Sequence, residues 1–272
     1  MTGYTADSCG KMPKLHSSKG NQNKWVEDNW WYKEDALGYE SLSEILISRL
    51  LKKSNLENYV LYEHVWIEKN GEQVNGCRSK NFLTKEDDRL ISAERLFQLR
   101  KGKGAAAACA EIAGTADRIR FFVEQAEEMT GIADFGRYLR NLLTLDALFL
   151  NEDRHFHNIA VIQRIDGSFR AAPVFDNGAA LFSDTRMEYP VSEPFENCLK
   201  KIKAKPFFTD FDEQLDAAEQ LYPRQPFQAW FTIGDVQNIL AELAGFYEPA
   251  AVRRIDETMR QQFRKYAYLF LE

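Results

Sequence analysis

The hydrophobic pattern of the chain changes from strand-like to helical near Leu83, and this change constrains the fold more than any other feature. Before it, residues 59–68 are β-branched and aromatic, Asn70-Gly71 is a strong hairpin signal, and residues 73–83 can form the returning strand. Residues 30–33 also resemble a short strand, and residues 41–53 carry apolar residues at helical spacing. The first part of the chain is therefore predicted to be a small, mostly β unit with one helix.

After Leu83 the apolar residues recur at helical spacing. Helices are predicted over residues 105–113, 115–129, 135–150 and 235–246, with a further helix near the C-terminus. The helix over residues 135–150 is apolar nearly all round, so it is expected to be buried. The predicted fold class is therefore α+β, with residues 1–80 and 81–272 as two domains.

Composition places the chain among ordinary folded proteins. With 272 residues, of which 44% are hydrophobic and 28% charged, it can bury a sizeable core. The net charge of −6 gives no general attraction to nucleic acid or anionic lipid, so a nucleic-acid partner is not expected. No stretch approaches the roughly 18 uninterrupted apolar residues that a membrane span needs, so no membrane insertion is expected.

Cysteine usage and the N-terminal sequence bear on location. The four cysteines lie far apart without a Cys-x-x-Cys pair, and no apolar segment that could act as a signal peptide follows Met1. A cytoplasmic location is therefore predicted.

Residues 151–178 hold the polar residues that point most directly to chemistry. Residues 158–163 and 169–175 are strand-like, and Asp166-Gly167 between them is a two-residue hairpin turn. With these two in the turn, the numbers of opposed residues add up to 333, which puts Asn158 opposite Phe175 and beside Asp176. Since magnesium prefers oxygen ligands, Asn158 and Asp176 are candidate metal ligands.

Asp153 precedes Asn158 by five residues, which is the interval found in the protein kinase catalytic loop. In that loop the aspartate accepts the proton of the substrate hydroxyl and the asparagine binds metal. The segment from Phe175 to Gly178 then takes the place of Asp-Phe-Gly, with a glycine two residues after the metal-binding aspartate, where the chain must turn. The ordered set predicts phosphoryl transfer.

These motifs resemble those of the HipA-like kinases and, more distantly, of the phosphatidylinositol kinases. The resemblance lies in an Asp-Arg-His-x-x-Asn loop, here Asp153-Arg154-His155-Phe156-His157-Asn158, followed by Phe175-Asp176. It extends upstream, because the phosphate loop Gly-x-Gln-x-Lys, the strand lysine and the helix glutamate have counterparts in Gly20-Asn21-Gln22-Asn23-Lys24, Lys33 and Glu44.

The resemblance implies a bilobal kinase-like fold with ATP in a cleft between a β-rich N-lobe and a helical C-lobe. It implies ATP and Mg²⁺ as cofactors and a protein serine or threonine hydroxyl as acceptor. Asp153 would be the base, Lys33 and His155 further catalytic residues, and Ser17 or Ser18 a site of autophosphorylation. Long HipA proteins have an extra N-terminal domain that packs against an antitoxin, and this sequence is expected to lack it, which argues against a toxin–antitoxin role but not against the catalytic inference. Whether another regulatory partner protein exists is not decided by the sequence.

Several of these residues also have a simpler interpretation. Lys33 could be an exposed lysine at a strand end. Glu44 could belong to a capping box that begins at Ser41, which would leave Glu40 as the partner of Lys33. The loop around Gly20 could be a mobile terminal segment.

The reaction itself is open to three further interpretations. His155 and His157 could bind zinc in a metallohydrolase. The acceptor of a kinase reaction could be a lipid or a small molecule. The chain could also be an inactive kinase-like protein that serves as a binding module.

Two lysine-containing segments are predicted to have no catalytic role. The glycine-rich residues 101–104 are predicted to be a linker, because the Gly-Lys-Ser/Thr ending of a phosphate loop is missing. The lysine-rich residues 200–205 are predicted to be a solvated face.

Overall fold

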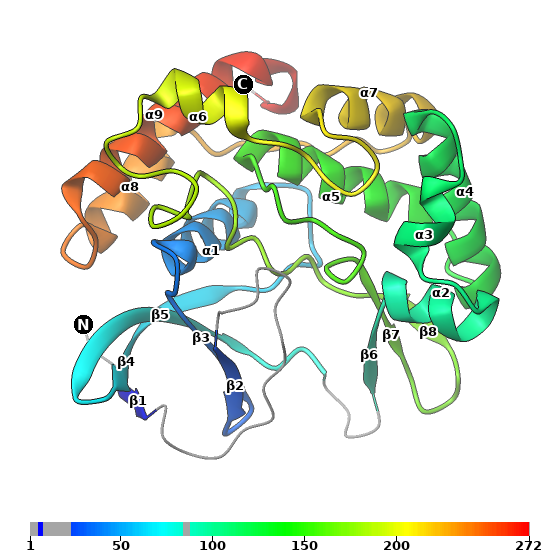
Figure 1. Cartoon of the computed structure of the whole chain (residues 1–272), viewed down its shortest axis with the longest axis horizontal. Helices are drawn as coiled ribbons and strands as arrows, with labels where there is room; N and C mark the ends of the chain where they lie inside the picture. Colours follow the sequence, from blue (N-terminus) through cyan, green and yellow to red (C-terminus); the bar gives the residue numbers. More distant parts are fainter. Residues whose placement is uncertain (1–4, 8–22, 84–87, 272) are drawn as a thin grey trace. The chain divides into compact units, whose positions relative to one another are not determined.

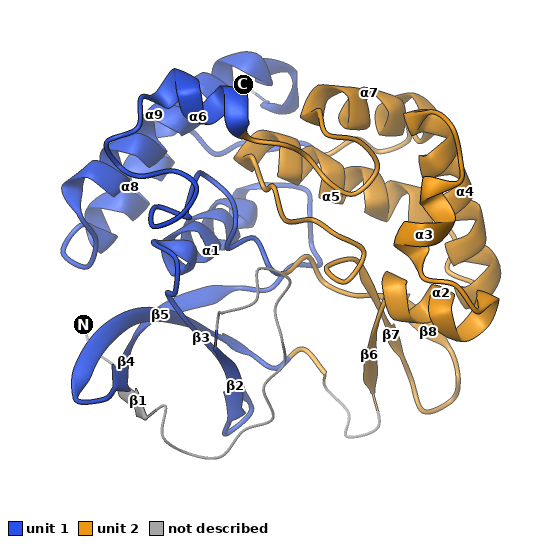
Figure 2. Ribbon diagram, viewed as in Figure 1, with its two compact units in different colours: residues 1–81, 176–201, 228–272 blue, residues 82–175, 202–227 orange. Residues whose placement is uncertain are grey.

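The computed structural model describes residues 5–7, 23–83 and 88–271 (Figure 1). They form two compact units, each built from segments that are distant in the sequence (Figure 2). Unit 1 comprises residues 1–81, 176–201 and 228–272, and unit 2 comprises residues 82–175 and 202–227. The chain leaves unit 1 next to the predicted domain boundary and later returns to it. The assignment of residues 1–80 and 81–272 to consecutive kinase lobes stays a prediction.

Unit 1 contains a five-stranded sheet in the order β1-β4-β5-β3-β2, in which β1 and β4 are parallel and the remaining neighbours antiparallel. Trp25 and Tyr32 stack across one strand pair with ring centroids 5.4 Å apart, and they form an apolar core with Val65 and Ile67. The strands are β1 (Thr5–Asp7), β2 (Lys24–Glu27), β3 (Trp30–Glu34), β4 (Tyr62–Lys69) and β5 (Glu72–Lys80).

Two tight turns set the register of this sheet. Asn70 and Gly71 have φ angles of 54° and 82° and close the β4–β5 hairpin, as predicted. Asp28 and Asn29 have φ angles of 47° and 67° and close the β2–β3 hairpin in the same way. Two-residue turns with positive φ match the twist of the paired strands, and Asn and Asp tolerate this conformation better than most residues.

Helix α1 (Glu40–Leu50) packs against β4, β5 and α8 (Ile233–Leu243), and almost all of its residues are buried. Its apolar side chains recur at helical spacing, which confirms the helix predicted over residues 41–53; the last of these form a 3₁₀ turn, η1 (Leu51–Lys53). The remaining helices of unit 1 are α6 (Phe195–Lys201), α9 (Pro249–Lys265) and the short η2 (Ala267–Leu269). Helices α8 and α9 confirm the two helices predicted toward the C-terminus.

The capping-box interpretation of Glu44 is wrong. The N-cap of α1 is Tyr39, and Ser41 lies inside the first turn, where its N–H donates to Asp35 Oδ1 at 2.6 Å. Because the helix begins earlier than the capping box requires, the Glu44 side chain is available for contacts outside its own helix.

Unit 2 combines a three-stranded antiparallel sheet, β6-β7-β8, with helices. Its aromatic core centres on Phe122, whose ring contacts those of Phe97, Phe135, Phe156 and Phe207. The strands are β6 (Arg89–Ser92), β7 (Ala160–Gln163) and β8 (Phe169–Ala171), and the helices are α2 (Ala93–Lys101), α3 (Ala105–Ala110), α4 (Thr115–Thr130), α5 (Phe135–Phe149) and α7 (Phe211–Leu221).

The helical predictions for this unit are confirmed in α3, α4 and α5, and α5 is buried along most of its length. Residues 102–104 connect α2 to α3, as the linker interpretation predicts. Gly102 ends α2 with a φ of 73°, a left-handed conformation that glycine adopts without strain.

The β7–β8 hairpin exists, but its predicted register is wrong by one residue. Opposed residues add up to 332, with Gln163 facing Phe169. Strand β7 begins only at Ala160, so Asn158 lies before the paired residues and is not the partner of Phe175.

The cause of the shift is the loop. Gly167 has a φ of 82°, its N–H donates to the carbonyl of Arg164, and the N–H of Arg164 donates to the carbonyl of Ser168. The glycine therefore supplies the left-handed residue of a three-residue loop, where the sequence predicts the second residue of a two-residue turn. One extra loop residue changes the register by one.

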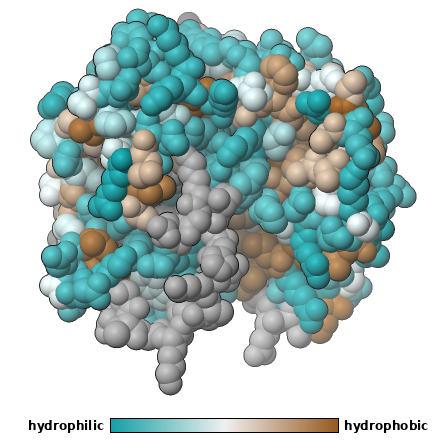
Figure 3. Space-filling model, viewed as in Figure 1, coloured by the Kyte–Doolittle hydropathy of each residue, from teal (hydrophilic) through white to brown (hydrophobic). Residues whose placement is uncertain are grey.

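Polar side chains cover most of the face drawn in Figure 3, with hydrophobic ones in smaller groups between them. Across residues 5–7, 23–83 and 88–271, none of the helices combines the length and the apolar character that a membrane span requires.

Candidate functional site

Two lysines face each other across the β2–β3 hairpin. Lys24 of β2 and Lys33 of β3 are direct cross-strand partners, so their side chains lie on the same face of the sheet. Like charges in this position repel, and such a pair needs an anion between or beside the two ammonium groups. The register of the hairpin thus brings two positive charges together where an anion can bind.

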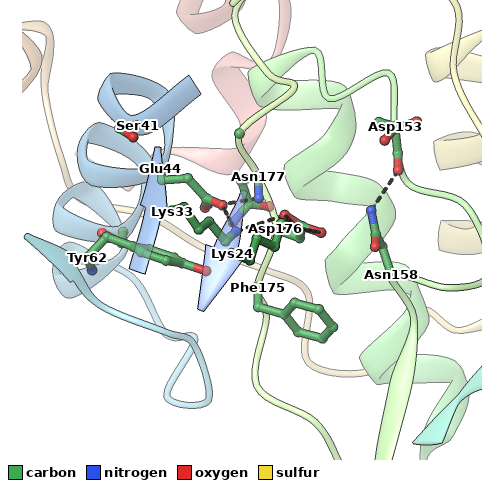
Figure 4. A network of polar contacts seen from close by, with 12 residues as sticks. Lys24, Lys33, Ser41, Glu44, Tyr62, Asp153, Asn158, Phe175, Asp176 and Asn177 are labelled. Carbon is green, nitrogen blue, oxygen red and sulfur yellow. Dashed lines mark hydrogen bonds and ion pairs between the residues drawn. The ribbon is translucent and has the colours of Figure 1, made fainter. Parts of the chain in front are cut away.

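In this structure the anion is Asp176 (Figure 4). Its Oδ1 lies 2.8 Å from Lys33 Nζ, and both of its oxygens lie 3.1 Å from Lys24 Nζ. Burial by itself would raise the pKa of Asp176, but the two ammonium groups outweigh burial and hold the pKa far below its ordinary value. Asp176 is therefore ionised at every physiological pH.

Glu44 is the second carboxylate in contact with Lys33. Its Oε1 lies 2.5 Å from Lys33 Nζ, and its Oε2 accepts the N–H of Asn177 at 3.0 Å. Burial lowers the pKa of Lys33, but Asp176 and Glu44 more than compensate and hold it well above the ordinary value. Lys33 is thus a buried, charged lysine, and not the exposed strand-end lysine of the simpler interpretation.

Glu40 does not take the place of Glu44. Its two oxygens accept the backbone N–H groups of Ala36, Leu37 and Gly38, at 3.3, 2.7 and 2.9 Å. Of the two glutamates between which the sequence does not decide, Glu44 is the one that pairs with Lys33.

Helix α1 also holds the segment that follows Asp176. Ser43 Oγ donates to the carbonyl of Ala180 at 3.1 Å, and Tyr39 Oη donates to that of Leu181 at 2.6 Å. Gly178 lies so close to the helix that an added Cβ would be 3.3 Å from Glu40 Cβ. Asp176 itself has a φ of 60°, whereas Gly178 is not among the residues with positive φ, so the absence of a side chain at Gly178 serves its close approach to α1.

In unit 2, Asp153 and Asn158 belong to one short loop between α5 and β7. Asn158 Nδ2 donates to the carbonyl of Asp153 at 2.9 Å, and the N–H of Asn158 donates to the carbonyl of His155 at 2.8 Å (Figure 4). Because the amide nitrogen is held by the loop, the amide oxygen is the atom that Asn158 can offer to a metal ion.

Arg154 braces this loop from inside. Its Nε lies 3.1 and 3.0 Å from the two oxygens of Asp146 on α5, and its Nη1 donates to the carbonyls of Asn158 and Phe175, at 3.3 and 2.8 Å. Burial raises the pKa of Asp146, and Arg154 opposes that rise. The guanidinium therefore ties the loop to the helix before it and to the residue that precedes Asp176.

His155 is predicted from the sequence to be a catalytic residue. Its Nδ1 accepts the N–H of His157 at 3.2 Å, and its Nε2 lies 3.8 Å from Asp153 Oδ2. The larger bracing network belongs to Arg154. In the part of the chain that the structure describes, no group of three His, Cys, Asp or Glu residues could hold a metal ion, so the zinc interpretation based on His155 and His157 gains no support.

Lys205 contacts Asp153 although it is 52 residues away in the sequence: its Nζ lies 3.0 Å from Asp153 Oδ1. Lys201 also makes contacts, because its Nζ donates to the carbonyl of Glu188. Both lysines are exposed, as the solvated-face prediction for residues 200–205 expects, and each also contacts a neighbouring segment.

Several predicted residues lie outside the described residues: Gly20, Asn21 and Gln22 of the phosphate loop, and Ser17 and Ser18. Within the described residues, Lys24, Lys33, Glu44 and Asp176 form one cluster in unit 1, and Asp153 and Asn158 belong to one loop in unit 2. We call the first the lysine–carboxylate cluster and the second the Asp153 loop.

Three residues of these two networks are not predicted from the sequence: Asp146, Arg154 as the brace, and Lys205. Asp146 carries a weak signal, since a charged residue in a helix that is apolar nearly all round needs a buried partner. The turn residues Asp28-Asn29 could have revealed the pairing of Lys24 with Lys33.

Mg²⁺ and ATP can be tested against these donors. Asp176 is an ionised carboxylate with a preference for cations, and Asn158 has an amide oxygen, so both offer the hard oxygen atoms that Mg²⁺ prefers. Lys24 and Lys33 offer two ammonium groups side by side, which suits a polyphosphate. The chemistry of the donors fits both groups.

The comparisons with known proteins concern the fold. No protein-family model matches the sequence, and no curated protein is similar to it. Among solved structures, the chain is similar to the crystal structure of a Helicobacter pylori proinflammatory kinase, CtkA, with a TM-score of 0.63 and 15% sequence identity over 97% of this chain and 95% of that chain. The predicted α+β, kinase-like fold is therefore confirmed.

Proposed function

We propose that this chain is an ATP- and Mg²⁺-dependent kinase, similar to the HipA-like kinases, that transfers the γ-phosphoryl group to a serine or threonine hydroxyl of a protein. The observation that carries the proposal is the contact of Lys33 with both Glu44 and Asp176. In protein kinases a β3 lysine pairs with a helix glutamate, and the metal-binding aspartate completes the site. The likeness of the fold to that of a solved kinase structure supports the same conclusion.

The proposed reaction assigns a role to each residue. The acceptor oxygen attacks the γ-phosphorus, the bond from the γ-phosphorus to the β–γ bridging oxygen breaks, and ADP leaves. Asp153 accepts the proton of the acceptor hydroxyl. Lys24 and Lys33 hold the phosphates by charge, and Gly20, Asn21 and Gln22 contribute the phosphate loop.

Asn158 and Asp176 are the proposed magnesium ligands. When bound, the metal neutralises the negative charge that the phosphates carry into the transition state. Glu44 keeps Lys33 charged and in place, and Arg154 keeps the Asp153 loop in shape. His155 is a positioning residue beside Asp153.

The proposed setting is the cytoplasm, with a protein as acceptor and no role for nucleic acid or membrane insertion. The direct test is incubation of the purified full chain with γ-labelled ATP and a general protein substrate, with and without Mg²⁺. We expect label on protein only with Mg²⁺, and none from the Asp153→Ala variant. Parallel reactions with lipid vesicles and with small alcohols distinguish a lipid or small-molecule acceptor from a protein. Absence of label from every acceptor, including the chain itself, contradicts the proposal.

Autophosphorylation of Ser17 or Ser18 is part of the proposal. A phosphoserine beside the phosphate loop adds nearly two negative charges, which would repel the ATP phosphates and lower nucleotide affinity. Mass spectrometry after incubation with ATP and Mg²⁺ is expected to find phosphate on one of the two serines in the wild type and on neither in Asp153→Ala. Phosphate on neither serine of an active wild type, or undiminished ATP binding by the phosphorylated form, contradicts it.

A further inference from the structure

Lys205 reaches the proposed base from a distant loop. Its Nζ lies 3.0 Å from Asp153 Oδ1, and the Asp153 side chain is only 11% exposed, whereas that of Lys205 is 47% exposed. A half-exposed lysine contributes little to folding through such a pair, because water screens the charge and the long side chain loses entropy. Stability alone therefore does not explain the contact.

The loop that carries Lys205 is held in place by buried groups. Gln214 of α7 is 1% exposed; its Nε2 donates to the carbonyl of Lys205 at 3.1 Å, and its Oε1 accepts the N–H groups of Phe207 and Phe208, at 2.8 and 3.3 Å. The three backbone groups that Gln214 binds belong to Lys205 itself and to the nearby Phe207 and Phe208. A single buried amide thus fixes the backbone from which Lys205 projects.

The same loop packs directly on the Asp153 loop. Phe207, two residues after Lys205, contacts Phe156 edge to face with ring centroids 5.4 Å apart, and Phe156 lies three residues after Asp153. Both rings are buried. A packed aromatic pair therefore joins the two loops close to both residues, and Lys205 Nζ lies within contact distance of the Asp153 carboxylate.

We propose that Lys205 is a positioning residue for the phosphoryl transfer, which holds the Asp153 carboxylate by one oxygen and so orients it toward the acceptor hydroxyl. The inference rests on the proposed function and adds to it a residue from outside the kinase motifs. A base works only within hydrogen-bond reach of the proton it removes, so restricting the rotation of the carboxylate favours the reactive geometry. The contact bears on the turnover step and not on ATP binding.

The test compares Lys205→Ala with Lys203→Ala, a matched removal of an exposed lysine two residues away in the same segment. We expect Lys205→Ala to lower kcat at least about tenfold with the KM for ATP changed less than about twofold, and Lys203→Ala to change neither. Thermal unfolding of both variants is expected to match the wild type, since neither side chain is part of the core.

A double-mutant cycle then asks whether Lys205 acts through Asp153. In an Asp153→Asn background, the further change Lys205→Ala is expected to have no additional effect on kcat, because the carboxylate that it orients is gone. An equal effect of Lys205→Ala in both backgrounds overturns the inference, as does an unchanged kcat in the single variant.

The outcome separates this inference from the proposed function. A wild type that transfers phosphate and depends on Asp153, together with an unimpaired Lys205→Ala, overturns the role of Lys205 alone. A wild type without transfer, or one indifferent to Asp153→Asn, overturns the proposed function and the inference with it.

Discussion

The Lys33 ammonium lies 2.5 Å from Glu44 Oε1, and both side chains are shielded from water, with 9% and 0% of their surfaces exposed. The second oxygen of Glu44 accepts a backbone N–H from the segment that begins with Asp176. One carboxylate therefore connects strand β3, helix α1 and residues 176–177. A substitution of Glu44 should destabilise the packing of all three, because a buried charge without its partner is costly.

Glu44→Gln should destabilise unit 1. The glutamine keeps the shape of the side chain but loses the charge opposite Lys33, and breaking a buried ion pair typically costs about 3–5 kcal/mol. Since Lys33 retains Asp176, we expect a loss of about 3 kcal/mol in the free energy of unfolding, measured by urea denaturation. The matched control is Glu242→Gln, whose partner Arg49 and own side chain are both partly exposed; we expect a loss below about 1 kcal/mol. Equal losses in the two variants would contradict the assignment.

The ion pairs of Asp176 should make stability depend on pH in the acidic range. Its folded-state pKa is held below the ordinary value, so the charged carboxylate stabilises the fold above the ordinary aspartate pKa, and that contribution is lost as the pH falls toward the folded-state pKa. We expect the wild type to exceed Asp176→Asn in unfolding free energy at pH 7 and the difference to shrink below about pH 4. Urea unfolding of both proteins at several pH values measures it. A difference that stays constant or grows with acid rules out this role for the carboxylate.

Asp176→Ala and Asp153→Ala should separate nucleotide binding from turnover. We expect Asp176→Ala to abolish Mg²⁺-dependent binding of ATP as well as turnover, because it removes a proposed metal ligand. Asp153→Ala should lower turnover by about a hundredfold or more and largely spare binding, since a base acts in the transition state. Isothermal titration with a non-hydrolysable ATP analogue, with and without Mg²⁺, is the measurement. Equal loss of binding in both variants counts against Asp153 as the base.

Arg154→Lys should destabilise unit 2 although it keeps the charge. The lysine cannot reach both oxygens of Asp146 and the two backbone carbonyls that the guanidinium serves, so buried acceptors are left without donors. We expect the free energy of unfolding to fall by about 3 kcal/mol or more. Arg260→Lys, in an exposed pair with Asp256 on α9, serves as the control and should change it by less than about 0.5 kcal/mol. If both substitutions lower the free energy of unfolding by the same small amount, Arg154 does not brace the Asp153 loop.

Local patterns in the sequence predict most of the elements. The alternation around Asn70-Gly71 and the helical spacing in α1, α4 and α5 each reflect interactions between residues that are close in the chain, so they can be read from the chain. The β7–β8 hairpin is also predicted, but its register depends on whether Gly167 takes the second place of a two-residue turn or the left-handed place of a longer loop. Both are compatible with Asp-Gly, and only the hydrogen bonds of Arg164 decide between them.

By itself the sequence determined the α+β class, the strand that carries Lys33, the helix that carries Glu44, and the five-residue interval from Asp153 to Asn158. The tertiary structure decided which glutamate meets Lys33, which cation meets Asp153, and that Asp176 lies against two lysines of a distant hairpin. The reason is physical: these contacts join residues 11 to 152 positions apart, and they form because burying charged groups requires partners that only the packed chain brings together.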